Sequence, residues 1–565
     1  MKTKRLLSVC ISILLCLTLG LSLVSCKNDD EATPASTSSL GDSSSKSTEP
    51  ITIRVYNAMA ATKPTKDNKI YKRIQEETGV KFEFEFLSGD AIQKAGEMIE
   101  NETYPDLLGL SGEQSGLQEF LDAGALIPLE QYINKYPNLK KHYGPIINQI
   151  KDPVSGHVYI MPNYGVTSGT YNSSESYGAA FWIQAAVLKE AGYPKIETLD
   201  EWFEIIQKYM AKYPRINGQK TIGFEILADK SKDWTLRNAP AQLSGHPNDG
   251  NVIVDNNVAR IFAGLDVSKK YYKKLNEMYQ AGVVDPECFK MDFDTYISKI
   301  SSGRVLGLFD QRWNFQIGYN SIIGQEMYDR HYVPVPVTFD KETKDWYLNN
   351  PIINVNSGYG ISVNCENPER IMQVFDTLLE EKWQKIMQWG IEGEDYMVDS
   401  SGKFYRTPEQ RDNSLRDDWK ISNRVEALLQ YCPKLEGSYS DGNSTEPALQ
   451  PGEYFATLKD EQKEVLNAYK VETQGQLFGT PPENPVYFPC YTMTIPVGSE
   501  QQMTEQRLKD KAFKHLPKII SSKPSEFESL WKQYTDDINK ENIAGLEKLY
   551  NDGIQDRLIK WAKTN

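Results

Sequence analysis

Aromatic side chains in expected loops are the residues of this sequence that are best suited to recognition chemistry. Tyrosine outnumbers phenylalanine 32 to 20. Sugars present flat C–H faces that pack on aromatic rings, and their hydroxyls need donors and acceptors, which a tyrosine also supplies. The candidate loop aromatics are Tyr164, Tyr171, Tyr177, Phe181, Trp182, Trp234, Trp313, Tyr359, Trp389, Tyr396, Tyr487 and Phe488. Core packing is the competing explanation, and it is favoured for the tryptophans inside helical patterns, which are Trp202, Trp383, Trp531 and Trp561.

Motifs of the common catalytic and cofactor sites do not occur in the sequence. There is no G-x-x-x-x-G-K-[ST], H-E-x-x-H or G-x-S-x-G string. Gly358-Tyr-Gly360 begins like a dinucleotide-binding loop, but Val363 stands where a third glycine is required. The five histidines are scattered without metal-ligand spacing. We therefore predict no cofactor, no metal and no catalytic residue.

Carboxylates could still form a glycosidase pair, which needs two acids facing one sugar. With 77 acids in the chain, spacing alone cannot identify such a pair. Glu392, Glu394 and Asp395 form an acidic cluster that we interpret as a solvated turn after a helix. Asp249 and Asn251 flank a glycine as in a calcium loop, but the later ligands of an EF-hand are missing. A binding protein is favoured over an enzyme, and a membrane-anchored glycan-degrading enzyme is the alternative.

Composition sets the class of protein. The chain has 565 residues, which suits two or three domains of about 150 residues each. A net charge of −14 argues against a nucleic-acid binder, because phosphate binding needs a basic face. A mean hydropathy of −0.53 with one long apolar run excludes a polytopic membrane protein. Four cysteines lie beyond the N-terminal region, with no C-x-x-C; they suit buried free thiols or one bridge.

The first fifty residues predict where the protein is located. Three basic residues precede the nearly continuous apolar run from 6 to 24. The run ends in Leu23-Val24-Ser25-Cys26, which resembles the lipobox of bacterial lipoproteins, where the peptide before the cysteine is removed and the thiol is acylated. Residues 1–26 are therefore expected to be a lipoprotein signal peptide, with an uncleaved anchor as the alternative. Residues 27–50, rich in Ser and Thr, predict a flexible tether. Either reading of the leader predicts that the remainder lies on the extracellular face of the cytoplasmic membrane.

The body of the chain alternates between strand and helix periodicities. Residues 51–55, 81–86 and 106–110 predict strands, and two amphipathic helices separate them. This β-α-β-α-β order predicts a mostly parallel sheet covered by helices. Thr198 and Glu201 predict a capping box that opens a helix to about Tyr213. The other predicted elements are helices at 267–280, 295–302 and 369–389, a strand at 305–308, and a largely helical stretch with one break at 525–563.

Six short strings give the chain a family resemblance. Together with the lipobox and the tether, they resemble the extracellular solute-binding lipoproteins of bacterial ABC importers (family 1), and more narrowly the LipO-like group related to alginate-oligosaccharide binders. In chain order, the strings lie at 105–108 (PDLL), 123–129 (AGALIPL), 138–140 (NLK), 156–162 (GHVYIMP), 281–287 (AGVVDPE) followed by 303–314, and 389–396 (WGIEGEDY). Each string is weak alone, whereas six in this order over most of the chain are specific.

Two departures from the family pattern bear on the ligand. Relatives often have W-I-R-x-D-W-L where this chain has Trp182-Ile-Gln-Ala-Ala-Val-Leu188, so an Arg and an Asp are lost. Many relatives have an acidic calcium loop after the capping-box helix, whereas residues 213–221 contain no acid. These differences favour a neutral ligand over a uronate and argue against structural calcium.

The resemblance implies an α/β, two-lobed periplasmic-binding-protein-like fold with a hinged interdomain cleft. We expect lobe one at 51–165 and 353–430, and lobe two at 166–352 and 431–565. It implies a monomer that captures an oligosaccharide and delivers it to the membrane subunits of an ABC permease. A peptide-binding or sensor lipoprotein is a further alternative. The expected stacking platforms are Trp182, Trp234, Trp313, Tyr359 and Trp389, and the expected hydroxyl partners are Asn57, Glu113, Asp310 and Arg312, with Arg237 as a weaker candidate.

Overall fold

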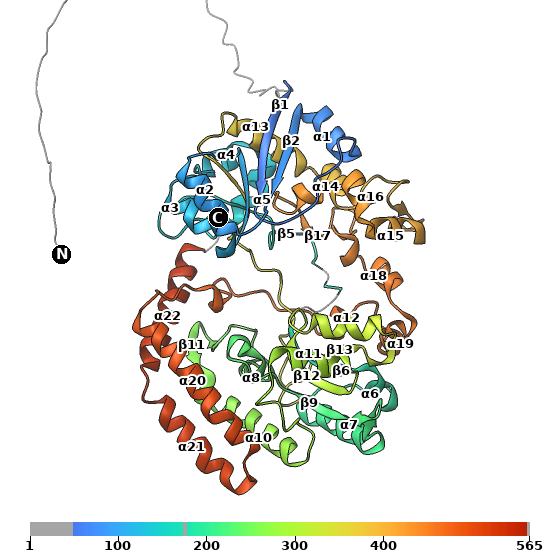
Figure 1. Ribbon diagram of the computed structural model, residues 1–565, viewed down its shortest axis with the longest axis vertical. Coiled ribbons are helices and arrows are strands. Elements are labelled where there is room, and N and C mark those ends of the chain that lie inside the picture. Colours follow the sequence, from blue (N-terminus) through green and yellow to red (C-terminus); the bar gives the residue numbers. More distant parts are fainter. Residues whose placement is uncertain (1–48, 172, 175–177, 562–565) are drawn as a thin grey trace, which may run out of the picture. The chain divides into compact units, whose positions relative to one another are not determined.

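The computed structural model describes residues 49–171, 173–174 and 178–561 (Figure 1). The signal peptide, Cys26, nearly all of the tether and Tyr177 lie outside the described residues. Within the described ranges, no helix combines the length and the apolar character needed to cross a membrane. The four cysteines of this part of the chain, Cys288, Cys365, Cys432 and Cys490, are free thiols.

The first sheet confirms the predicted β-α-β-α-β unit. Its strand order is β2-β1-β3-β14-β4, in which β1 pairs parallel with β2 and β3, and β14 pairs antiparallel with β3 and β4. The strands are β1 (Ile51–Asn57), β2 (Val80–Phe86), β3 (Leu107–Ser111), β4 (Met161–Pro162) and β14 (Ser357–Ile361). The connecting helices are α1 (Lys69–Thr78), which Asn68 caps and Gly79 ends in a left-handed conformation, and α2 (Ala91–Glu100).

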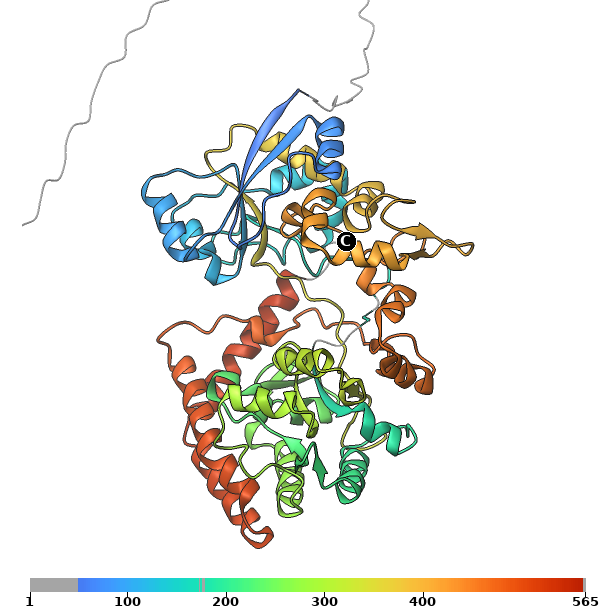
Figure 2. The same ribbon diagram turned by 45° about the vertical axis from the view of Figure 1, so that its right-hand side comes forward.

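Further helices pack around this sheet. They are α3 (Leu117–Asp122), α4 (Glu130–Lys135), α5 (Pro137–Tyr143), α13 (Pro368–Leu378), α14 (Glu381–Gln388), α15 (Pro408–Leu415), α16 (Asp417–Asn423) and α17 (Glu426–Leu429). The views in Figures 1 and 2 agree that α16 lies beside α1, where the Asn68 side chain donates to the Ile421 carbonyl oxygen at 3.0 Å. The short hairpin β15 (Met397–Val398) and β16 (Phe404–Tyr405) precedes α15.

The single helix predicted for 369–389 is wrong, because the chain forms α13 and α14 with a break between them. Glu380 is extended, with φ −61° and ψ 136°. The Gln384 side chain is fully buried and donates to the Leu378 carbonyl oxygen at 2.7 Å, so it satisfies an acceptor at the end of α13. The break lets both helices bury apolar residues in the same core, which includes Phe375 and Met387.

The second sheet has the order β13-β6-β12-β9 and belongs to a separate hydrophobic core. In this sheet β12 pairs parallel with β9, whereas β6 pairs antiparallel with both of its neighbours, β12 and β13. The strands are β6 (Ala179–Gln184), β9 (Ile222–Glu225), β12 (Val305–Gln311) and β13 (Tyr332–Val335). Strands β6 and β12 are buried along their whole length, as expected of strands covered on both faces.

Helices cover this sheet as predicted. The capping box forms between Thr198 and Glu201 and opens α7, which ends before Tyr213. The helices are α6 (Ala185–Glu190), α7 (Leu199–Lys212), α8 (Trp234–Arg237), α9 (Ala239–Leu243), α10 (Asp266–Gln280), α11 (Phe293–Ser301) and α12 (Gln316–Gly324). The hairpins β7 (Arg215–Ile216) with β8 (Gln219–Lys220), and β10 (Val252–Asp255) with β11 (Val258–Ile261), lie between them in sequence.

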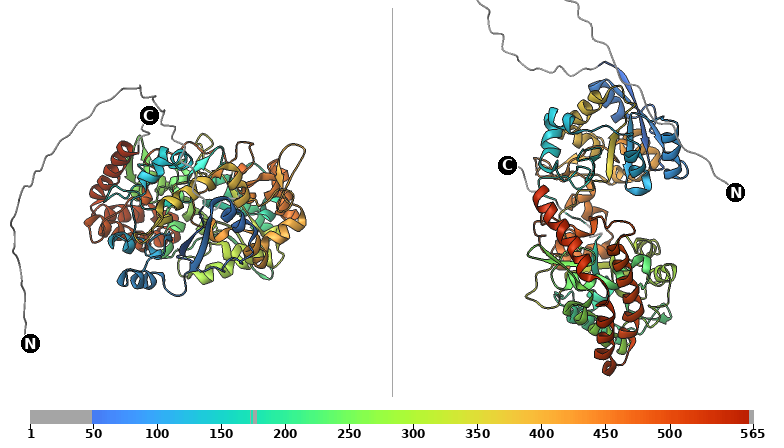
Figure 3. Two further views of the ribbon diagram at one scale, coloured as in Figure 1. Left: turned by 90° about the horizontal axis from the view of Figure 1, so that it is seen from above. Right: turned by 90° about the vertical axis from the view of Figure 1, so that its left-hand side faces the viewer.

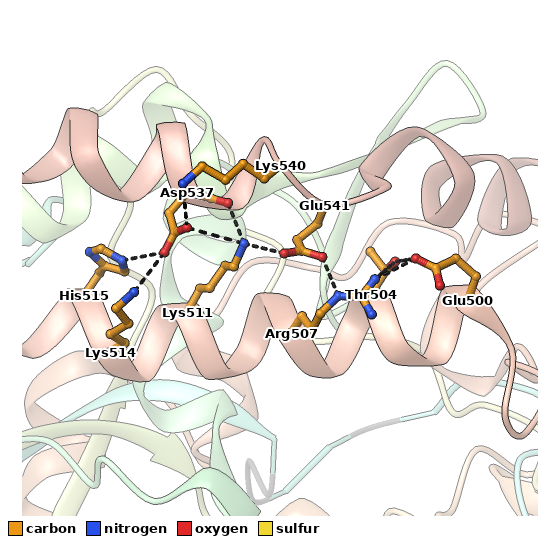
Figure 4. Close-up of polar contacts among 9 residues, drawn as sticks. All are labelled: Glu500, Thr504, Arg507, Lys511, Lys514, His515, Asp537, Lys540 and Glu541. Atoms are coloured by element: carbon orange, nitrogen blue, oxygen red, sulfur yellow. Dashed lines mark hydrogen bonds and ion pairs between the residues drawn. The ribbon is translucent and has the colours of Figure 1, made fainter.

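Three C-terminal helices pack against the same core, and the predicted break falls at 539–542. They are α20 (Glu500–Ser521), α21 (Phe527–Ile538) and α22 (Ile543–Lys560), preceded by α18 (Pro451–Thr457) and α19 (Asp460–Tyr469). Figure 3 shows the three helices side by side. Asp537 accepts from His515 at 3.0 Å and Lys514 at 3.2 Å, and these hydrogen bonds hold the pKa of Asp537 far below its usual range (Figure 4). The network fixes α21 against α20.

Residues 163–178 and 336–356 connect the strands of the two sheets, and a third segment, residues 430–450, leads from α17 to α18. Strand β5 (Thr167–Ser168) pairs parallel with β17 (Glu436–Gly437), and Gly165, just before β5, lies against Ile352. Gly165 has φ +86°, and a Cβ atom there would lie 2.1 Å from the Ile352 carbonyl oxygen. Glycine is therefore required for this close approach of two crossing segments. The backbone N–H of Gly165 donates to the buried Glu436 carboxylate at 2.6 Å.

Candidate ligand-binding site

Asp310, near the carboxyl end of β12, is the centre of a buried hydrogen-bond network. Its carboxylate accepts from Trp234 Nε1 at 3.2 Å, the Tyr296 hydroxyl at 2.9 Å, Asn314 Nδ2 at 2.8 Å and the Gln311 backbone N–H at 2.7 Å. Burial raises the pKa of Asp310 to about 6 despite these donors. Because Asp310 has no exposed surface, it is an internal anchor rather than the expected hydroxyl partner.

A second buried cluster fixes the helix that supplies Tyr296 to this network. Lys299, one turn further along α11, approaches Asp285 at 2.5 Å and Glu225 at 3.8 Å. Burial and the neighbouring Asp285 raise the pKa of Glu225 well above its ordinary value. Lys299 thus ties α11 to the end of β9, and the Tyr296 hydroxyl ties the same helix to Asp310 in β12.

The two predicted platforms Trp234 and Trp313 form an aromatic pair next to this anchor. Their ring centroids are 5.4 Å apart with an interplanar angle of 45°. Trp313 is 53% exposed, whereas Trp234 is half-buried and is fixed through its indole N–H by Asp310. Lys232 places its ammonium 5.7 Å from the centroid of Trp234. An exposed indole held against an anchored one is a surface on which a sugar face can stack.

The two arginines among the predicted ligand contacts, Arg312 after β12 and the weaker candidate Arg237 at the end of α8, bind other groups of the protein. Arg312 is 3% exposed; its guanidinium lies 3.6 Å from the centroid of Tyr319 and hydrogen-bonds Gln316. Arg237 pairs with Asp233 at 2.5 Å and donates to the Asn251 side chain. Both guanidiniums are engaged within the protein, so the expectation that they contact ligand hydroxyls does not fit this conformation.

Three of the five predicted platforms are core residues, which corrects that part of the prediction. Trp182, Tyr359 and Trp389 have no exposed surface. Trp182 lies in β6 and donates to the Asp310 carbonyl oxygen at 2.8 Å. Trp389 donates to the Ser444 carbonyl oxygen at 2.9 Å and packs among aromatic rings. A ring covered on both faces cannot stack on a sugar.

Tyr359 and Asn57 meet in the first sheet. The Tyr359 hydroxyl donates to Asn57 Oδ1 at 3.0 Å, and Asn57 Nδ2 donates to the Ala427 carbonyl oxygen at 2.7 Å. Asn57 is 2% exposed, but it lines a cavity of about 280 Å³ at the carboxyl end of β1. Ligands of open α/β sheets bind at this end of the strands. Glu113 begins the 3₁₀ helix η1 (Glu113–Ser115) after β3, and its side chain is outside what the structure describes.

Several residues of this cavity are absent from the sequence-based prediction. They include Phe86 at the end of β2, and Lys420, Arg424 and Tyr431 from the α16–α17 region. The α16–α17 region is more than 300 residues from β1 in sequence. Neither spacing nor a turn signal connects the two, so the sequence alone offered no means to find these residues.

The remaining loop aromatics divide between surface and core. Tyr164 is 46% exposed and Tyr171 is half-buried, whereas the buried rings are Phe181, Tyr396, Tyr487 and Phe488. The helical tryptophans Trp202, Trp383 and Trp531 are buried, as predicted, but Trp561 is half-buried and packs under Arg557.

The acidic strings are structural. Glu392 and Glu394 are exposed and the segment forms a turn, as predicted. Asp395 is the exception, because it is buried, accepts from the Ile391 backbone N–H and pairs with Lys69 at 2.8 Å. Asp249 is buried and accepts from the Cys490 backbone N–H. Among the residues that the structure describes, no three His, Cys, Asp or Glu side chains are placed to hold a metal ion. Gly358 lies inside β14 rather than in a phosphate-binding loop.

A further cavity of about 360 Å³ lies beside the edge strand β13. Val333 and Phe478 contribute apolar surface to it, and Lys341 contributes a charge. None of the predicted site residues lines this cavity, whereas Asn57 lines the cavity beside β1. Predicted site residues are therefore accessible to a ligand at two places, the tryptophan pair and the β1 cavity.

Comparison with known sequences identifies relatives. Residues 69–373 match the family of bacterial extracellular solute-binding proteins. The chain is 26% identical over 257 residues to the fructooligosaccharide ABC transporter substrate-binding protein FusA of Streptococcus pneumoniae, covering 44% of this chain and 47% of FusA. It is 27% identical over 128 residues to lipoprotein LipO of Bacillus subtilis, covering 23% of this chain and 22% of LipO. The matched region thus spans less than half of each of these relatives.

Solved structures share the fold. A human-milk-oligosaccharide (HMO) binding, ABC-transporter-associated solute-binding protein from Bifidobacterium longum infantis gives a TM-score of 0.61 at 16% identity, covering 90% of this chain and 99% of that chain. FusA in complex with kestose gives a TM-score of 0.54 at 18% identity, covering 90% and 100%. The chain has the two-lobed α/β fold of these proteins, as predicted. The family match extends over more than half of the sequence, and the chain therefore belongs to the bacterial extracellular solute-binding proteins.

Proposed function

We propose that this protein is a cell-surface lipoprotein that captures an oligosaccharide between its two lobes and delivers it to an ABC permease. The exposed Trp313 ring, held at a tilt beside the anchored Trp234, carries this proposal, because an exposed indole next to a half-buried one offers apolar surface that suits the C–H faces of sugars. Membership of the solute-binding family and the oligosaccharides named for FusA support it.

The proposal assigns residues 51–165 and 353–430 to lobe one, and 166–352 and 431–565 to lobe two, with one correction at the boundary: Tyr431 and Cys432 pack in the core of the first sheet and therefore go with lobe one. The segments that cross between them, pinned by β5, β17 and Gly165, would be the hinge. The β1 cavity and the tryptophan pair would then face each other across the cleft. A ligand that contacts both lobes favours the closed form, because only that form makes both sets of contacts.

The anchor is part of the proposal. Cys26 would carry the lipid, residues 27–50 would act as a tether, and the protein would work as a monomer beside its permease on the extracellular face of the membrane. The net charge of −14 would keep the lobes away from an anionic lipid surface. No catalytic step is proposed.

The test is calorimetric titration of the full chain, in detergent, with neutral and acidic oligosaccharides and with peptides. We expect saturable binding of an intact saccharide, with no shortened product recovered afterwards. Shortened products would indicate the glycan-degrading alternative, and binding of peptides alone would refute a sugar ligand. Small-angle scattering should show a smaller radius of gyration with ligand than without it.

The tryptophan pair provides a sharper test of the same proposal. Replacing Trp313 with Ala should weaken binding about tenfold, because roughly 60 Å² of apolar contact at about 25 cal/mol per Å² is about 1.5 kcal/mol. Trp561→Ala, a tryptophan change at the end of α22, is the matched control and should leave affinity unchanged. Equal affinities of the two variants would exclude the indole pair as the sugar platform.

A further inference from the structure

The cavity beside β1 is preformed by hydrogen bonds between distant parts of the first sheet region. One wall is the loop after β1, and the other is the α16–α17 region. The Thr65 backbone N–H donates to the Ile421 carbonyl oxygen at 2.9 Å, and Asn68 Nδ2 donates to the Arg424 carbonyl oxygen at 2.8 Å. These bonds fix both walls without any ligand, so a molecule that binds there pays little to order the site.

Two buried polar atoms of residues that line this cavity have no hydrogen-bond partner anywhere in the described part of the chain. They are the hydroxyl of Tyr431, whose side chain has no exposed surface, and Nη1 of Arg424. The ring of Tyr431 packs on Gly109, where even a Cβ atom would lie 2.6 Å from it, so the hydroxyl cannot move far. A buried polar group without a partner is costly, and a ligand with oxygen atoms at the right place removes that cost.

The rest of the lining indicates what such a ligand is. Two cationic residues, Lys420 and Arg424, line the cavity together with two anionic ones, Asp417 and Glu426, so the charges balance and no net charge is selected. Apolar surface comes from Phe86 and other side chains of the two walls. Balanced donors and acceptors around an apolar wall match a sugar ring, which has hydroxyls at its edge and C–H groups on its faces.

We infer that the β1 cavity holds one neutral sugar ring of the bound oligosaccharide, with the Tyr431 hydroxyl and the Arg424 guanidinium donating hydrogen bonds to its oxygens. This inference rests on the proposed function and adds to it the class of ligand, a neutral oligosaccharide, and two residues that determine specificity. At about 280 Å³, the cavity is at the lower end of the size range of small-molecule sites and suits one part of a longer chain.

The test uses the full chain with five neutral trisaccharides, kestose, maltotriose, cellotriose, xylotriose and mannotriose, and one acidic trisaccharide, trigalacturonate. At least one neutral trisaccharide should bind more tightly than trigalacturonate. With that sugar, Tyr431→Phe should bind roughly tenfold more weakly. Its unfolding temperature should stay equal or rise, because the hydroxyl that is removed has no partner in the free protein. If Tyr431 had only a structural role, Tyr431→Phe would lower the unfolding temperature together with the affinity.

Tyr56→Phe is the matched control. Tyr56 is equally buried and its hydroxyl also has no partner among the described residues, but it does not line the cavity, so its removal should leave affinity unchanged. Arg424→Lys keeps the charge, loses the planar fork and should also weaken binding. If Trp313→Ala weakens binding while Tyr431→Phe binds as tightly as the wild type, the cavity inference is wrong and the proposed function stands. Preferred binding of trigalacturonate also overturns the inference. Absence of binding to every saccharide overturns both.

Discussion

Asp310 should make the stability of the protein depend on pH in a direction opposite to that of ordinary surface carboxylates. The carboxylate is fully buried, and burial raises its pKa to about 6 in the folded protein, from an ordinary value of 3.8. Because the folded state holds the proton more tightly than the unfolded chain, the stabilising contribution of protonated Asp310 is complete below the unfolded pKa and is lost as pH rises through about 6.

The magnitude follows from the two pKa values. Between about pH 4.5 and about pH 7.5, the linkage relation gives a loss of about 2 kcal/mol of unfolding free energy from this one group. Asp310→Asn cannot titrate, so the difference in stability between the variant and the wild type should change by that amount over this range. Other carboxylates are present in both proteins, and their effects cancel in the difference.

The assay is urea unfolding followed by tryptophan fluorescence, since Trp234 reports directly on the anchor that it donates to. We expect the variant to gain stability relative to the wild type as pH rises. A difference that is constant across the range would refute the reasoning, because it would mean that Asp310 does not change its charge between these pH values. A variant that instead loses stability relative to the wild type as pH rises would require an Asp310 pKa below its ordinary value.

Other sites give further predictions. Burial raises the pKa of Glu436, in crossing strand β17, to about 7, so its stabilising contribution is lost as pH rises through about 7; Glu436→Gln should gain about 3 kcal/mol relative to the wild type between about pH 4.5 and about pH 8 in urea unfolding. Gly165→Ala should cost at least ~2 kcal/mol in thermal unfolding, since a Cβ atom there meets a carbonyl oxygen at 2.1 Å. Gly89→Ala, at φ +87° in open space, should cost about 1 kcal/mol and is the control. Tyr359→Phe removes a hydrogen bond to Asn57 and should lower the unfolding free energy by about 1 kcal/mol.

Local patterns predicted most of the elements correctly. The alternation at 81–86 is β2, the capping box at Thr198 opens α7, and the stripe after Asp90 is α2. These features depend on neighbours within about two helical turns, which a sequence displays directly. The break between α13 and α14 does not follow from such a local pattern, because the buried side chain of Gln384 stabilises it from inside the core. The antiparallel pairing of β6 likewise depends on where distant strands lie.

The site is harder to predict than the fold, because an aromatic side chain can bind a ligand only where it is exposed to solvent. Local sequence patterns do not determine that exposure. Trp313 and Trp389 both have polar or small neighbours in sequence, whereas Trp182 lies between Phe181 and Ile183, and of the three only Trp313 is exposed. The other two indoles are closed off by strands and loops far away in the chain, as the bond from Trp389 to the Ser444 carbonyl oxygen shows.

The two halves of the candidate site therefore differ in how far a sequence can reveal them. Trp313 follows β12 directly, so a strand-end argument finds it. Tyr431 reaches the end of β1 only because α1 and the α16–α17 region are bonded together, and nothing near Tyr431 in sequence marks it. Where a distant segment forms one wall of a pocket, substitutions in that segment can change the residues that line the pocket without disturbing the strands of the sheet. If the β1 cavity selects the sugar, specificity among relatives should vary most in such segments, while the strand-end tryptophan supplies the general affinity for sugar rings.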